Sequence, residues 1–160
     1  MKEDFKEGTK EDIMDISQLN IRGRMAYGLV CVAAYMEHVG IDVSPYQDAF
    51  DVLAQYMAAV NLAEWDACAK AQIYDDCSDE AQWGIMETIL DDLYWIGAGE
   101  LYGQPSDCKE SERLLNKLLA VLGAAGVAPP HMEPFVRYRL DNPASVDEYF
   151  GEPFAFSLTQ

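Results

Sequence analysis

The sequence predicts an all-α fold, a single-domain bundle of five to six helices around one central apolar helix. Residues 25–36 carry no charge, and apolar residues in the later segments recur at helical spacing. No run alternates between apolar and polar residues over more than a few positions, which argues against a sheet. The 160 residues, half of them hydrophobic, are enough for one domain that buries roughly 70% of its unfolded surface.

The central helix is expected at about residues 21–39, with apolar side chains around most of its circumference. Gly28 predicts a point where a neighbouring element approaches closely, because glycine is otherwise unfavourable inside a helix. Gly40 predicts a left-handed stop, after which Ile41 folds back on the last turn. The two bases at the start, Arg22 and Arg24, are expected to offset acidic charge or to hold the C-terminal segment.

Two shorter helices are expected next. Ser44, Pro45 and Gln47 have the pattern of a capping box and predict a helix that runs to about residue 60. Its inward face is expected to comprise Phe50, Leu53, Tyr56, Met57 and Val60. Asn61 with Glu64 predicts a second start. The inward face of that helix is expected to comprise Leu62, Trp65, Cys68, Ala69 and Ile73.

Ser78 predicts the cap of a long helix from Asp79 to between residues 96 and 101, with Met86, Ile89, Leu90 and Leu93 turned inward. A leucine-rich helix is expected from residue 107 to about 125, with Gly126 as its stop. Prolines then exclude a long helix, so the C-terminal segment is predicted to be irregular and aromatic. The mixed-charge residues 1–13 are expected to be disordered, and residues 14–160 to form the domain.

Charge is the most unusual bulk property of the sequence. The 28 acidic and 11 basic residues give a formal net charge of -17. Between Met25 and Cys108 there are fifteen acids and a single base, Lys70. A field of this sign attracts basic surfaces and argues against binding to nucleic acid or to an anionic membrane. A purely solubilising role for the acids stays an alternative.

The residues that most often carry chemistry form no recognisable grouping. The four cysteines contain no CxxC pair and are expected to be reduced thiols of a cytoplasmic protein; they are Cys31, Cys68, Cys77 and Cys108. Neither His38 nor His131 stands at the Glu-x-x-His spacing of carboxylate metal sites. The acidic turn after Tyr74 lacks the central glycine of a calcium loop. We therefore expect no catalytic residue, no cofactor and no metal.

An acidic stripe around the start of the long helix is the predicted partner-binding surface. Asp79 and Glu80 suit the positive end of the helix dipole, whereas Glu87 and Asp91 lie further along without that compensation. Tryptophans at the edge of a core are common interface anchors, and Trp83 adjoins the stripe. The candidate residues are Asp75, Asp76, Asp79, Glu80, Trp83, Glu87 and Asp91.

Three segments carry a family resemblance: IRGRMAYGLVCVAAYMEHVGID, NLAEWDA and ASVDEYFGEPF. Together they resemble small helical immunity proteins of bacterial polymorphic toxin systems, over about residues 16–156. The resemblance implies a cytoplasmic protein that binds one cognate toxin domain and blocks its active site without doing chemistry. It carries over no functional residue.

Other classes stay open at this point. An acidic mimic of nucleic acid would inhibit a DNA-binding protein, provided that its carboxylates were spaced like phosphates along a flat surface. A carboxylate-dependent hydrolase would need acids that converge in a pocket. A scaffold whose acidity serves only solubility is the third alternative. The sequence makes no prediction of the oligomeric state.

Overall fold

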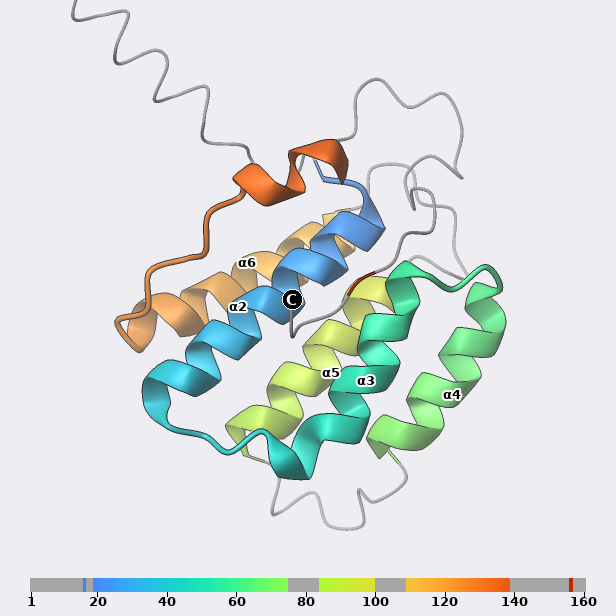
Figure 1. Cartoon of the computed structure of the whole chain (residues 1–160), viewed down its shortest axis with the longest axis horizontal. Coiled ribbons are helices and arrows are strands. Elements are labelled where there is room, and N and C mark those ends of the chain that lie inside the picture. Colours follow the sequence, from blue (N-terminus) through green and yellow to red (C-terminus); the bar gives the residue numbers. More distant parts are fainter. Residues whose placement is uncertain (1–15, 17–18, 75–83, 100–108, 139–155, 157–160) are drawn as a thin grey trace, which may run out of the picture.

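The computed structural model describes residue 16, residues 19–74, 84–99 and 109–138, and residue 156. The α-helices of these residues are α2 (Ile21–Val39), α3 (Gln47–Ala54), α4 (Leu62–Tyr74), α5 (Ile85–Ala98) and α6 (Lys109–Ala124). Three short 3₁₀ helices accompany them: η2 (Ser44–Tyr46), η3 (Gln55–Met57) and η5 (Glu133–Tyr138). The predicted all-α bundle is confirmed (Figure 1). The expected disordered segment 1–13 lies outside the described residues.

Helix α2 forms the centre of the bundle, with the bounds that the apolar pattern predicts. It packs against α3, α5 and α6 and also contacts η3 and η5 (Figure 1). The side chains of Met25, Leu29 and Val32 have no exposed surface. Because neighbours cover α2 on several sides, its apolar residues extend around most of its circumference instead of forming one stripe.

Gly28 is the point of close approach that its position in the helix predicts. A Cβ atom at this position would lie 3.0 Å from Leu93 Cδ2 of α5 and 3.6 Å from Leu115 Cδ1 of α6. The missing side chain therefore lets three helices meet at one level. The resulting dispersion contacts offset the cost of about 1 kcal/mol for glycine inside a helix.

Two glycine stops are also confirmed. Gly40 has a φ of 80°, and the Ile41 N–H donates to the carbonyl of Met36 at 2.9 Å. Gly126 likewise has a φ of 80°, and the Val127 N–H donates to the carbonyl of Leu122 at 2.9 Å. At both ends the left-handed residue lets the chain turn back and satisfy a free carbonyl.

The helix expected from Ser44 to residue 60 differs from the prediction at both ends. No side-chain cap forms at Ser44; its N–H instead donates to Asp42 Oδ1 at 3.1 Å, and η2 precedes α3. The helical run stops with η3 at Met57. Val60, expected to face inward, is 87% exposed because it lies in the link beyond the last turn. The other predicted inward residues are buried: Phe50, Leu53, Tyr56 and Met57.

Helix α4 starts where Asn61 predicts. Asn61 Oδ1 accepts from the Glu64 N–H at 3.1 Å, and its amide donates to Glu64 Oε2 at 3.2 Å. Trp65 and Ala69 are buried as expected, but Cys68 is exposed. At about 100° per residue, the arc from Trp65 to Ile73, which also holds Leu62 and Ala69, passes within about 20° of Asp66, whereas Cys68 lies about 60° outside its other edge. The inward assignment of Cys68 was wrong for this reason.

The residues that follow α6 bring an aromatic contact back to α2. Phe135 of η5 is buried, and its ring meets Tyr27 edge to face at a centroid distance of 5.3 Å. Phe156 is half-buried against the core. The rest of the predicted aromatic C-terminal segment lies outside the described residues. Among the helices that are described, none combines the length and the apolar character that crossing a bilayer requires.

Candidate partner-binding surface

Most of the predicted acidic surface lies outside the described residues. Five of its seven candidates belong to the range 75–83: Asp75, Asp76, Asp79, Glu80 and Trp83. The remaining two, Glu87 and Asp91, are one turn apart on α5, and both are partly exposed. The structure therefore brings two of the predicted residues to one helix face.

Glu87 has a local structural task. Its Oε1 accepts from the Gly84 N–H at 2.8 Å, and the Thr88 hydroxyl donates to the Gly84 carbonyl at 3.2 Å. Gly84 is extended, with φ -110° and ψ -160°, so the helix begins at Ile85. The predicted continuous helix from Asp79 is therefore wrong at its start. The carboxylate also suits the positive end of the α5 dipole.

Asp92, next to Asp91, is a buried acid that the acidic stripe did not include. It is 8% exposed and pairs with Lys117 of α6 at 3.2 Å. Burial raises the pKa of the Asp92 carboxyl above its ordinary value of 3.8, and the hydrogen bond from Lys117 opposes that rise. The spacing on α5 could not reveal this contact, because Lys117 lies 25 residues away.

Three of the exposed acids of the described residues lie at one end of the bundle, while the others lie on further elements: Asp51 of α3, Glu64 of α4, Glu110 of α6 and Glu133 of η5. Helix α2 ends and α3 and α5 begin at the lower edge of Figure 1. Exposed carboxylates at this end belong to Glu37, Asp42 and Asp48. The described arginines of α2, Arg22 and Arg24, stand at its opposite terminus. Three exposed acids therefore share the end of the bundle that lies away from these two arginines.

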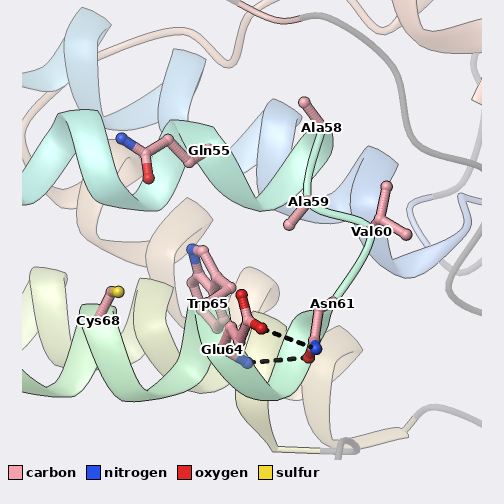
Figure 2. A pocket seen from close by; sticks show the side chains of 8 residues that line it. All are labelled: Gln55, Ala58, Ala59, Val60, Asn61, Glu64, Trp65 and Cys68. Carbon is pink, nitrogen blue, oxygen red and sulfur yellow. Dashed lines mark hydrogen bonds between the residues drawn. The ribbon is translucent and has the colours of Figure 1, made fainter.

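A hollow of about 520 Å³ opens between η3 and the start of α4 (Figure 2). Eight residues line it: Gln55, Ala58, Ala59, Val60, Asn61, Glu64, Trp65 and Cys68. The Trp65 indole is already fixed, since its Nε1–H donates to the Val52 carbonyl at 2.7 Å. Glu64 and Asn61 bond each other at the helix cap. Asn61 and Glu64 of this hollow thus serve the start of α4, and Trp65 ties α4 to α3.

Two buried arginines join segments that are distant in the sequence. The Arg22 guanidinium donates to the carbonyl of Tyr56, and also to that of Met57 at 3.2 Å. Arg24 donates to the Ile16 carbonyl at 3.3 Å and to Ser111 Oγ at 2.6 Å. These contacts hold η3, α6 and the residues before α2. The arginines were expected instead to offset acidic charge or to hold the C-terminal segment.

Asp66 is the other buried acid that sequence reasoning missed. It is 2% exposed, accepts a hydrogen bond from the Tyr94 hydroxyl of α5, and lies 3.7 Å from Lys70. Trp65 stacks on Tyr94 at a centroid distance of 5.9 Å. Polar atoms of the α4–α5 contact are therefore paired inside an aromatic cluster, as burial requires.

The free thiols among the described cysteines differ in exposure. Cys31 is fully buried, and burial raises the pKa of its thiol to about 12, so it stays protonated and unreactive. Cys68 lies at the surface on α4. Within the described ranges, no three side chains of histidine, cysteine, aspartate or glutamate are grouped closely enough to hold a metal ion.

The geometry thus consists of a helical bundle, structural polar contacts inside it, and exposed acids of which three share one end. Comparisons with protein-family models, with curated protein sequences and with solved structures found no match to this chain.

Proposed function

We propose that this chain is an immunity-type protein that acts in the cytoplasm, binds a basic toxin domain and neutralises it without catalysis. The observation that carries the proposal is the charge distribution. Fifteen acids face one base between Met25 and Cys108, within a total net charge of -17. A binding protein with such a field associates quickly with a cationic partner, because opposite charges steer the encounter.

The packing of the described helices supports a binding role for this charge. The buried polar side chains are engaged in holding the bundle together, as Arg22 and Asp66 illustrate. Glu37, Asp42 and Asp48 remain exposed at one end. These acids are available to a partner without any loss of internal contacts, so the partner gains Coulomb attraction at little cost to the fold.

The decisive test starts from the gene immediately upstream. We expect it to encode a large secreted protein with a variable C-terminal domain. Expression of that domain in a host is expected to arrest growth, and coexpression of this chain is expected to restore it. Arrest that persists with this chain present contradicts the proposal. A neighbourhood of metabolic genes removes most of its support.

A second measurement tests the role of charge. The probe is the purified C-terminal domain of the secreted protein encoded upstream. Its association rate with this chain is expected to fall by at least about tenfold between low and high salt, because salt screens the electrostatic attraction of the acids. A rate that does not change with ionic strength would show that the acids do not steer binding. Association with a DNA-binding protein instead, at sites that DNA also occupies, would favour the nucleic-acid mimic.

A further inference from the structure

Three exposed apolar side chains lie at the same end of the bundle as the exposed acids Glu37, Asp42 and Asp48. Among the described residues, five large hydrophobic side chains are substantially exposed: Val39 42%, Val43 39%, Val60 87%, Ile85 46% and Trp95 42%. Val39 ends α2, Val43 precedes η2 and Ile85 begins α5. Single exposed hydrophobic residues are ordinary, but three from separate segments at one end form a candidate contact surface.

The helix registers place these three residues at one level. The Tyr56 hydroxyl donates to the Gly97 carbonyl, so residues 56 and 97 lie at about the same height. Because α3 and α5 run in the same direction, residues 44 and 85, which precede them by the same number of positions, also lie at about the same height. Helix α2 runs in the opposite direction, with Gly28 beside Leu93. Counting from this contact toward the C-terminus of α2 and toward the N-terminus of α5, the same rise per residue brings the end of α2 level with the start of α5. Figure 1 shows these ends together at its lower edge.

Exposed acids accompany these apolar residues on neighbouring positions of the same elements. Glu37 precedes Val39 by two residues, and Asp42 adjoins Val43. Asp48 follows in the first turn of α3. Protein interfaces commonly have an apolar centre and a polar rim. The negative charge of this rim selects a partner whose own rim carries lysine or arginine.

We propose that this bundle end is a docking surface for a basic protein segment with apolar side chains at its centre. The surface comprises Glu37, Val39, Asp42, Val43, Asp48 and Ile85. The choice of a basic partner rests on the proposed function. The apolar residues supply contact area that excludes water, and the acids attract and orient the segment. This surface extends the acidic candidate site beyond the residues that the sequence pattern selected.

Two synthetic helical peptides of about 15 residues serve as probes. The first is amphipathic, with leucines on one face and lysines on the other, and the second carries serine in place of every leucine. Fluorescence anisotropy at low salt measures the affinity of each for the full chain. We expect the leucine peptide to bind at least about tenfold more tightly, because only it can cover the apolar centre.

The V43S/I85S double variant is expected to lose about tenfold of the affinity for the leucine peptide and to bind the serine peptide unchanged. V60S is the matched control, because Val60 is even more exposed but lies beyond η3, at the other end of α3. Thermal unfolding checks that all variants fold. An equal loss of affinity for the leucine peptide in both variants, or equal affinity of the unchanged chain for both peptides, would overturn the proposed docking surface. Either result leaves the growth-rescue test intact, so the two proposals fail separately.

Discussion

The two sides of the bundle are held together by different chemistry. Where α2 meets α5 and α6, aliphatic side chains close around Gly28, and Leu93 and Leu115 lie within van der Waals reach of it. On the η3–α4 side, buried donors and acceptors make the connection. Arg22 bonds the carbonyls of η3, and the indole of Trp65 bonds that of Val52.

This difference determines which amino-acid substitutions each side of the bundle tolerates. Aliphatic contacts are non-directional, so a change of volume can be absorbed partly by neighbouring side chains. A buried hydrogen bond leaves its partner unsatisfied when one side is removed, and the partner then bears a full desolvation penalty. We therefore expect the η3–α4 side to be the more sensitive to conservative substitutions.

Arg22→Met should give the largest effect. Methionine preserves apolar volume but leaves the carbonyls of Tyr56 and Met57 without the guanidinium donor. We expect the free energy of unfolding to fall by about 3 kcal/mol, measured by urea denaturation. Arg113→Met is the control, since Arg113 pairs with Glu110 at the surface, and no measurable change is expected. Equal stability of the two variants would contradict the contrast between the two sides.

Two glycine substitutions compare the sides directly. A Cβ atom at Gly97 would lie 2.9 Å from Tyr56 Cε1 and 3.2 Å from Trp65 Cη2, and both rings are fixed by hydrogen bonds. At Gly28 the tightest contact is a leucine methyl group at 3.0 Å.

We therefore expect Gly97→Ala to cost about 2 kcal/mol and Gly28→Ala less than about 1 kcal/mol, because a leucine methyl group shifts more easily than two hydrogen-bonded rings, while the gain in helix propensity is common to both. Both values come from the same thermal or chemical unfolding experiment. A larger loss for Gly28→Ala would show that the aliphatic side is the more rigid one.

The same contrast explains which features the sequence could predict. Residues 21–39, the approach at Gly28 and the stops at Gly40 and Gly126 follow from local patterns, and the structure confirms them. Hydrogen bonds across the fold leave no local pattern. The burial of Asp66 depends on Tyr94, which is 28 residues away. Helical spacing places Asp66 near the buried arc of α4, but it does not reveal the partner that offsets the cost of burying a carboxylate.

Short-range polar contacts account for the remaining differences. The sequence predicted a single start for α5, the cap at Ser78, whereas the helix begins after Gly84, whose N–H donates to the Glu87 carboxylate. Of the predicted site residues, the structure describes Glu87 and Asp91, which share one face of α5; their role in binding stays a prediction. The exposed end formed by Val39, Val43 and Ile85 requires three separate segments to be placed in register, which no single pattern in the sequence contains.

The smallest effect concerns an ion pair on the aliphatic side, between the buried Asp92 of α5 and the exposed Lys117 of α6. Burial raises the pKa of Asp92 above 3.8, so between that value and the folded-state pKa the folded chain holds more protons than the unfolded chain. Stability from this group is therefore present below pH 3.8 and is lost as the pH rises through the folded-state pKa.

We expect Asp92→Asn to abolish this loss, which is measured as the difference in Tm between variant and wild type across the acidic range. Lys117→Met provides the opposing test. The Lys117 ammonium lowers the pKa of Asp92, so its removal should extend the loss to higher pH. If the pH dependence of Tm is identical in all three chains, Asp92 is equally protonated when folded and unfolded. The aliphatic side would then contain no titrating contact at this position.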